Sequence, residues 1–248
     1  MMNRFFEIFS EHYWSKWTVE YFACFLFILA LCVVFMAWFV GFLRIHKKIE
    51  TAYSRKIFHV VIFTMATLLQ WRYGIGVVLI FGFWVSCVVL FAIYKGDGFG
   101  FYEALARDSD RPHRRLYILL PLITTALGGL VSNLLFGPLA FVGYLVCGWG
   151  DAVGEPVGAA WGKNVYRVPS LTGLYSTRSL QGSLAVFIVS SIAAYTALYL
   201  SGLDMFHLVW VSLLCGMAAA LVEAVSAHGL DNFTIQVAAT AVAYFFIH

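Results

Sequence analysis

Residues 116–150 read LYILLPLITTALGGLVSNLLFGPLAFVGYLVCGWG, a run of 35 residues without a charged side chain. Soluble cores do not use apolar runs of this length, and runs of about 18 or more apolar residues are typical of transmembrane helices. Gly137 and Pro138 divide the run, because proline ends a helix and a Gly-Pro pair favours a turn. The run therefore predicts two membrane spans joined by a tight turn.

The same pattern recurs on both sides of this run. Other uncharged stretches cover residues 21–43, 73–94 and 179–203, and the whole chain is 62% hydrophobic and 12% charged. Soluble domains contain about 45–50% apolar and about 25% charged residues. We therefore predict an all-α fold, a polytopic membrane helix bundle with about eight transmembrane helices, in which residues 1–248 form a single integral membrane domain. The predicted spans cover residues 19–43, 57–71, 73–94, 116–136, 138–160, 180–201, 205–227 and 232–247.

Residues 1–18 precede the first predicted span. Their sequence begins MMNRFFEIFSEHYWSKW and places Phe, Tyr and Trp beside charged residues, which is typical of a helix that lies at the membrane interface. The net charge of the whole chain is only +3, which is too small to indicate a nucleic-acid partner.

Basic residues concentrate on alternate loops of the predicted bundle. Of the 16 Lys and Arg residues, five lie in residues 44–56, five in residues 95–115 and three in residues 161–179. Loops rich in Lys and Arg stay on the cytoplasmic side of a membrane. This distribution predicts that these three loops are cytoplasmic and that both termini lie outside. We expect the protein in the inner (plasma) membrane of a bacterium.

Polar segments that are distant in the sequence all fall at the cytoplasmic ends of predicted spans. They are SRKIFH (54–59), GDAVGEPVGAAWGK (150–163), STRSLQGS (176–183) and EAVSAHGLDN (223–232). A helix bundle can gather such ends into one pocket. We therefore predict a functional site on the cytoplasmic side.

Carboxylates within apolar helices indicate the chemistry of this site. Asp151 and Glu155 are four residues apart, so they lie on one helix face. A charged group inside a bilayer needs a partner, and magnesium commonly binds one or two carboxylates plus phosphate oxygens. The alternative is a structural carboxylate paired with a buried arginine, or a helix cap. Asp231 could likewise cap the last helix, or could complete a magnesium site with Asn232 and with Glu223 on the preceding helix.

Small and basic residues allow two interpretations each. Gly154, Gly158 and Gly162 recur every four residues, which indicates either close helix packing or a backbone that phosphate can approach, with Lys163 adding a charge. The pair Arg55 and His59, also four residues apart, could bind anions with Lys56 or could simply anchor the start of a span. Arg178 and Ser179 precede a predicted helix start, which is typical of an anion-binding N-terminus.

These segments, in this order over residues 55–232, resemble those of the CTP-dependent polyprenol, phytol and dolichol kinases, which belong to a wider group of membrane cytidylyltransferase-like proteins. The resemblance implies an integral membrane enzyme that uses CTP and Mg²⁺ to phosphorylate the hydroxyl of a long isoprenoid alcohol. This sequence departs from the pattern of the family at Gln181, where polyprenol kinases often have Glu, and at Glu155 and Pro156, where small residues are usual.

The resemblance, together with the residue chemistry, implies three sets of site residues. The catalytic set is Asp151, Asp231, Glu223 and His59, with Asp151 or Asp231 accepting the hydroxyl proton. The set that binds the nucleotide and its phosphates is Arg55, Lys56, Gly158, Gly162, Lys163, Arg178, Ser179 and Gly182. The metal set is Asp151, Glu155, Asp231 and Asn232.

Other functions remain open at this point. A phosphatidate cytidylyltransferase also uses CTP, but its terminal pattern continues to Asp-Arg-x-Asp, and here HGLDNF (228–233) is followed by no such sequence. A transporter would place its polar residues near the middle of the membrane, whereas these cluster towards one side. The expected partners are therefore the bilayer, a nucleotide and a lipid alcohol. The sequence does not identify the alcohol, exclude ATP as donor or predict the oligomeric state.

Overall fold

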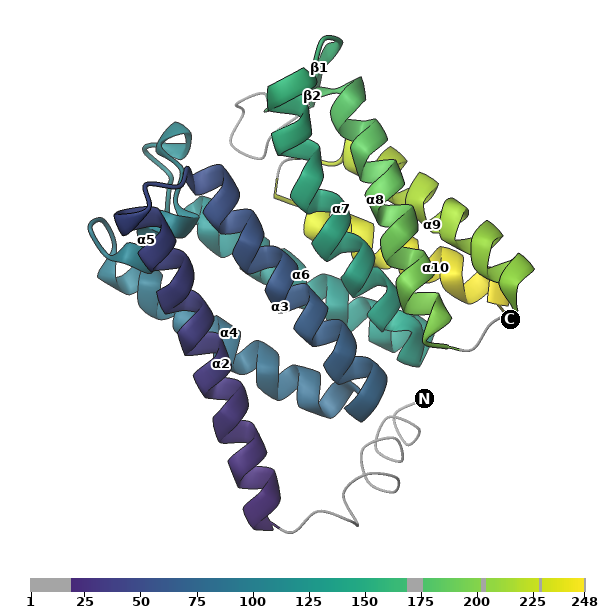
Figure 1. Cartoon of the computed structure of the whole chain (residues 1–248), viewed down its shortest axis with the longest axis horizontal. Coiled ribbons are helices and arrows are strands. Elements are labelled where there is room, and N and C mark those ends of the chain that lie inside the picture. Colours follow the sequence, from purple (N-terminus) through teal and green to yellow (C-terminus); the bar gives the residue numbers. More distant parts are fainter. Residues whose placement is uncertain (1–18, 169–175, 202–203, 228, 248) are drawn as a thin grey trace.

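The computed structural model describes residues 19–168, 176–201, 204–227 and 229–247. These residues fold into eight long helices, a short helix and a two-stranded hairpin (Figure 1). The predicted interfacial segment, residues 1–18, lies outside the described residues. The helices are α2 (Val19–His46), α3 (Thr51–Tyr73), α4 (Ile75–Lys95), α5 (Gly100–Leu105), α6 (Leu116–Phe136), α7 (Ala140–Trp161), α8 (Leu180–Tyr199), α9 (Met205–Val225) and α10 (Asp231–Ile247).

The turn between α6 and α7 forms where the sequence predicts it. α6 ends at Phe136, and a single 3-10 turn, Gly137–Leu139, leads into α7. Gly137 has φ +62°, a conformation that a residue with a Cβ rarely adopts. The turn between α3 and α4 likewise uses one glycine, Gly74, at φ +79°.

Segments with the length and hydropathy of membrane spans occur along most of the described chain. Five meet both conditions: Ala23–His46, Ile75–Lys95, Leu116–Trp161 (which contains both α6 and α7), Leu180–Tyr199 and Met205–Val225. Large apolar side chains also cover the outer faces of the helices, as Phe27, Phe83 and Leu221 show with 60% or more of their surface exposed. Both observations fit an α-helical, multi-pass membrane protein. The number of eight spans and the outward orientation of both termini stay predictions.

Buried apolar side chains of the described residues form two hydrophobic clusters that meet at α3. One joins α2, α4 and α5 to Phe58 and Ile62 of α3, and the other joins α7, α8, α9 and α10 to Phe63 of the same helix. Figure 1 shows the corresponding halves side by side, with the α7–α10 half at the right. α3 therefore connects the two halves, and polar residues near its N-terminus lie between them.

A small β-hairpin departs from the predicted all-α fold. β1 (Val165–Val168) pairs with β2 (Ser176–Ser179) in antiparallel register, with Tyr166 opposite Arg178. The hydroxyl groups of Tyr166 and Ser183 lie 2.8 Å apart, which ties the hairpin to the first turn of α8. The pairing fixes Arg178 and Ser179 directly before α8.

Candidate active site at one end of the bundle

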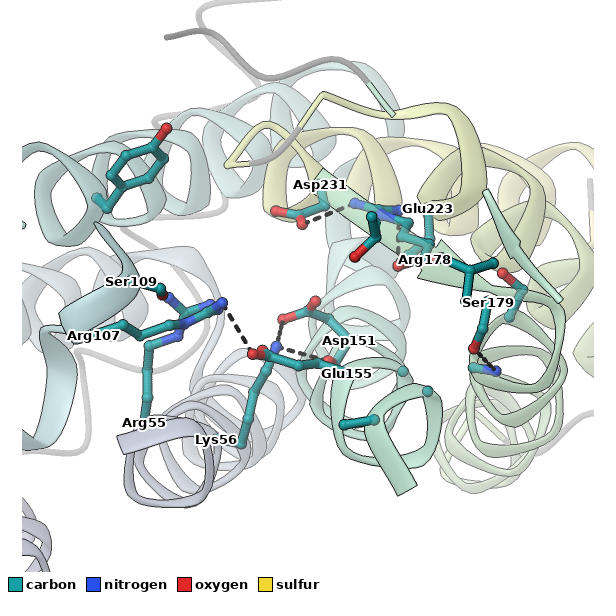
Figure 2. Close-up of a pocket in the computed structure, with 18 of the residues that line it drawn as sticks. Arg55, Lys56, Arg107, Ser109, Asp151, Glu155, Arg178, Ser179, Glu223 and Asp231 are labelled. Atoms are coloured by element: carbon teal, nitrogen blue, oxygen red, sulfur yellow. Dashed lines mark hydrogen bonds and ion pairs between the residues drawn. The ribbon is translucent and has the colours of Figure 1, made fainter. Parts of the chain in front are cut away.

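A cavity of about 590 Å³ opens at the end of the bundle where α3, α6, α8 and α10 begin and α7 and α9 end (Figure 2). This arrangement confirms that the four polar segments gather at one end. We call this space the polar cavity. Its described lining consists of Arg55, Lys56, Arg107, Ser109, Asp110, Tyr117, Asp151, Gly154, Glu155, Gly158, Ala159, Val165, Thr177, Arg178, Ser179, Gly182, Ser183, Glu223 and Asp231.

Asp151 is held by a lysine from the neighbouring helix. The ammonium of Lys56 donates to the Asp151 carboxylate and to its backbone carbonyl, each at 2.7 Å. Both side chains are nearly buried, with 8% and 13% of their surface exposed. Nε2 of His59 lies 3.5 Å from the same carboxylate oxygen. The pair thus joins α3 to α7 and directs a carboxylate at the cavity from a fixed position.

A second buried ion-pair group connects β2 with the last two helices. Nη1 of Arg178 lies 2.7 Å from the Glu223 carboxylate, and Nη2 lies 3.4 Å from that of Asp231. The Asp231 carboxylate also accepts the backbone N–H of Asn232 at 3.0 Å. Because Arg178 contacts two carboxylates, it positions Glu223 and Asp231 along one wall of the cavity, as Figure 2 shows.

The opposite wall carries two arginines. Nη1 of Arg107 lies 2.9 Å from the Glu155 carboxylate, while its buried Nε and Nη2 have no hydrogen-bond partner among the described residues. The Arg55 side chain also lines the cavity, and no hydrogen bond or ion pair joins it to another described residue. Buried N–H groups without partners are costly, so the Arg107 guanidinium, with the positive charge of Arg55 on the same cavity, favours an anionic ligand.

Arg107 lies in the connection between α5 and α6, which Arg114 fixes to the bundle. Arg114 is 5% exposed and donates to the carboxylates of Asp97 and Glu103 and to the carbonyl of Ala106. Burial raises the pKa of Glu103, but hydrogen bonds from Arg114 and from the Gly98 N–H lower it more, so its pKa lies below the ordinary value. Glu103 therefore stays ionised at neutral pH and keeps Arg114 in place.

The start of α8 has the form that the sequence predicts. Ser179 is the N-cap, and its hydroxyl accepts the backbone N–H of Gly182 at 3.1 Å. The Gln181 side chain reaches across to accept the backbone N–H of Lys163 at 3.1 Å, just after the end of α7. The C-terminal end of α7 and the N-terminus of α8 are therefore bound together beside the cavity.

The glycines of α7 serve close packing and also line the cavity. A Cβ at Gly154 would lie 2.9 Å from Val186 of α8, and a Cβ at Gly158 would lie 2.9 Å from the Ser179 hydroxyl. A Cβ at Gly182 would lie 2.7 Å from the Gly154 carbonyl. Gly162 also faces Ser179, but it is not part of the cavity lining. The packing interpretation of this glycine series is therefore correct, and Gly154, Gly158 and Gly182 also leave backbone accessible to a ligand.

A smaller space of about 110 Å³ adjoins the polar cavity. We call it the apolar cavity. The two share Arg55, Tyr117, Asp151 and Asp231. The remaining described lining comes mainly from α3, α4 and α6 and consists of Phe58, His59, Ile62, Phe63, Val85, Val89, Leu105, Ile118, Pro121, Leu122, Thr125, Gly229 and Asn232.

The predicted metal residues have separate partners. Asp151 pairs with Lys56, Glu155 with Arg107 and Asp231 with Arg178. Asn232 is buried and its amide donates to the Thr125 hydroxyl at 2.9 Å. It lines the apolar cavity but not the polar cavity. Within the described ranges no group of three or more His, Cys, Asp or Glu residues could hold a metal ion by itself. A metal here would need oxygen atoms from a ligand.

Two basic side chains lie in positions that the sequence analysis did not predict. Lys163 is exposed beyond the end of α7 and does not line either cavity, although the G-K element suggested a role in phosphate binding. Arg107, by contrast, enters the polar cavity, whereas the sequence indicated only that its loop was basic. The available signal was the density of arginines in residues 95–115, and nothing in their spacing distinguishes Arg107 from Arg111.

Comparison with known proteins gives one partial match to a curated enzyme. A segment of 106 residues is 30% identical to the phytol kinase of Synechocystis sp. (strain ATCC 27184 / PCC 6803 / Kazusa) and covers 42% of this chain. The match spans 43% of that phytol kinase, less than half of its length. No protein-family model and no solved structure matches the chain.

Proposed function

We propose that this protein is a membrane lipid kinase that transfers the γ-phosphate of CTP to the hydroxyl of an isoprenoid alcohol, in the presence of Mg²⁺ and at the cytoplasmic face. The observation that carries the proposal is the polar cavity, where Nε and Nη2 of Arg107 have no hydrogen-bond partner among the described residues, fixed carboxylates line the same space, and an apolar space opens alongside. The partial similarity to a phytol kinase and the resemblance to the CTP-dependent polyprenol kinases support the same reaction.

The charges of the polar cavity favour a polyphosphate that arrives with a metal ion. Its described lining carries four basic side chains (Arg55, Lys56, Arg107 and Arg178) and five carboxylates (Asp110, Asp151, Glu155, Glu223 and Asp231), a formal charge of −1. The net negative charge of the lining would repel a free nucleoside triphosphate, whereas it would repel the less negative magnesium complex far less.

The residues present fit magnesium in its usual nucleotide complex. Asp151 and Glu155 are one turn apart on α7 and both face the cavity, so they are the side chains that would hold the ion together with phosphate oxygens. Bound there, magnesium would neutralise charge on the transferring phosphoryl group. Arg107, whose partner is Glu155, and Arg55 supply the N–H donors for the remaining phosphate oxygens.

Asp231 is the better placed acceptor for the hydroxyl proton. It lines both cavities, and its nearest cation, Arg178, is 3.4 Å away, whereas Lys56 is bonded to Asp151 at 2.7 Å. The alcohol oxygen forms a bond to the γ-phosphorus as the bond from that phosphorus to the bridging oxygen breaks. The hydroxyl proton passes to the Asp231 carboxylate, and the products are the lipid phosphate and CDP.

Isotope transfer tests this function. Purified protein in lipid vesicles is incubated with Mg²⁺, a panel of alcohols (phytol, geranylgeraniol, farnesol, a polyprenol and diacylglycerol) and CTP or ATP labelled at the α- or γ-phosphate. We expect label from the γ-position of CTP in an isoprenoid product. Transfer of the α-label with release of pyrophosphate would instead establish a cytidylyltransferase. Absence of label from every alcohol would contradict the proposed kinase reaction.

The cytoplasmic position of the site has its own test. Ser109 lines the polar cavity, whereas Ser201 follows α8 at the opposite end of the bundle. In a variant without native cysteines, we expect an impermeant thiol reagent to label Ser201→Cys in intact cells and to leave Ser109→Cys unlabelled. The reverse pattern would contradict the orientation.

A further inference from the structure

We infer that the apolar cavity binds the carbons of the lipid alcohol next to its hydroxyl, while the rest of the chain stays in the bilayer. The inference rests on the proposed function for the identity of the ligand. It adds the place where the alcohol binds and the residues that restrict which alcohols are accepted.

Continuity with the polar cavity is the first argument. Arg55, Tyr117, Asp151 and Asp231 line both spaces. A molecule in the apolar cavity can therefore present its end group to the carboxylates that face the nucleotide site. A hydroxyl placed between Asp151 and Asp231 would lie where the proposed proton acceptor and the phosphate-binding side chains meet.

The chemistry of the lining is the second argument. Beyond the four shared residues, the described lining of the apolar cavity contains no Asp, Glu, Lys or Arg. Its walls include Ile62 of α3, Val85 and Val89 of α4 and Leu122 of α6. Such a surface favours a hydrocarbon and disfavours a sugar, an amino acid or a free phosphate. A charged end and a hydrocarbon wall together match a long-chain alcohol that carries one polar group.

The extent of the cavity limits how much of the chain it holds. Along α6 the lining runs from Tyr117 to Thr125, eight steps of the helix, or about 12 Å at 1.5 Å per residue. This length is far short of a membrane span of about 30 Å. The cavity can therefore enclose only the carbons closest to the hydroxyl, so selection should depend on branching near the hydroxyl more than on total chain length.

Photochemical labelling tests where the alcohol binds, without requiring turnover. Wild-type protein in phosphatidylcholine vesicles is irradiated with a phytol analogue that carries a diazirine near its hydroxyl, and labelled peptides are identified by mass spectrometry. We expect label on the α3, α4 or α6 residues of the apolar cavity, reduced at least about tenfold by excess phytol. Label confined to outer, bilayer-facing residues such as Phe83, or label that phytol does not reduce, would overturn the inference.

A pair of neighbouring substitutions tests the same site by kinetics. Val89 is 4% exposed and lines the cavity, whereas Leu90, the next residue of α4, is 49% exposed on the outer face. We expect Val89→Phe to raise the KM for phytol at least about tenfold, with the KM for CTP within about twofold, because the added ring occupies the cavity. Leu90→Phe should leave both constants within about twofold of wild type. Equal phytol KM values for the two variants would overturn the inference.

A substitution that enlarges the apolar cavity provides a second test if Val89→Phe does not fold. Leu122→Ala removes side-chain volume from the α6 part of the lining, and we expect it to improve the use of alcohols that are bulkier near the hydroxyl than phytol, relative to phytol, at least about threefold. An unchanged preference would overturn the inference. These results are separable from the proposed function. If the protein does not phosphorylate the alcohol but phytol still reduces the labelling of the apolar cavity, only the proposed function is wrong. If the protein is active but the label lies elsewhere, only the binding of the alcohol in the apolar cavity is wrong.

Discussion

The two cavities share a boundary but differ in how their walls are held. The polar cavity is surrounded by side chains fixed through ion pairs between elements: Lys56 with Asp151, Arg107 with Glu155, and Arg178 with Glu223. Away from the residues that it shares with the polar cavity, the apolar cavity is lined mainly by apolar side chains of α3, α4 and α6, which contact one another by packing. In the polar cavity, individual ion pairs therefore determine where each charged group lies. In the apolar cavity, the shapes of the packed side chains mainly determine the space.

This difference predicts how substitutions should act. Removing a charge from the polar cavity affects its partner as well as the ligand, because an unpaired buried charge is costly. Changing a side chain in the apolar cavity alters mainly volume, which a neighbouring side chain can partly accommodate. Effects in the polar cavity should therefore be larger and should depend on the partner residue.

Asp151 should show the largest effect. Asp151→Asn removes a charge that would neutralise the transferring phosphoryl group through magnesium, and we expect specific activity to fall by more than about a thousandfold. The substitution also leaves Lys56 buried without its partner, which costs about 3–5 kcal/mol of stability. Thermal unfolding and specific activity across a magnesium titration measure the two effects.

The double variant Lys56→Met, Asp151→Asn separates catalysis from structure. It removes both charges, so stability should return towards that of wild type while activity stays low. If Asp151 served only to pair with Lys56, the double variant would regain activity to within about tenfold of wild type, and the catalytic role of Asp151 would be wrong.

Arg107 should show an intermediate effect that is specific to the nucleotide. Its Nε and Nη2 have no partner among the described residues, so a bound phosphate would gain charge-assisted hydrogen bonds worth about 1.5–3 kcal/mol. We expect Arg107→Gln to weaken CTP binding about 10- to 100-fold, as measured by equilibrium dialysis with Mg²⁺. Arg111, in the same connection, is 63% exposed and lies outside the cavity, so Arg111→Gln is the matched control. Equal affinity of the two variants would exclude Arg107 from the phosphate site.

A substitution in the helix packing should leave the chemistry almost unchanged. Gly143 of α7 packs against Gln236 and Thr240 of α10, and an added Cβ would overlap the Gln236 backbone. We expect Gly143→Ala to cost about 1–3 kcal/mol and to lower Tm by several degrees, with activity per folded molecule within about threefold of wild type. Gly82→Ala is the control, because nothing lies within 4 Å of its added Cβ. A large loss of activity without loss of stability would indicate that α7 must move during turnover.

The sequence predicts the helices and the gathering of their polar ends because both follow from local periodicity. Arg178, Glu223 and Asp231 lie at or beside helix ends and face one cavity together with Asp151, which lies in the middle of α7. Arg107 could not be predicted, because its position depends on Arg114 contacting Asp97 and Glu103, and tertiary contacts of a loop leave no periodic signal. The same limit explains Lys163, which follows a matched motif but extends beyond the end of α7.

The sequence pattern likewise does not predict which basic residue pairs with which carboxylate in the polar cavity. The four-residue spacing places Asp151 and Glu155 on one face, but their different partners, Lys56 of α3 and Arg107 of the α5–α6 connection, depend on how the helices assemble. The two-stranded hairpin is also a tertiary feature, since four residues in each strand give too short a pattern to distinguish it from a loop.

In the proposed reaction, the nucleotide donor and the alcohol acceptor occupy different cavities that meet at Asp151 and Asp231. Steady-state kinetics of Arg107→Gln and Val89→Phe, with CTP and phytol each varied at several fixed concentrations of the other, test it most directly. We expect a crossed result: Arg107→Gln raises the KM for CTP at least about tenfold and leaves that for phytol within about threefold, whereas Val89→Phe raises the KM for phytol at least about tenfold and leaves that for CTP within about twofold. If either variant raised both KM values by the same factor, the nucleotide and the alcohol would not be bound by separate cavities.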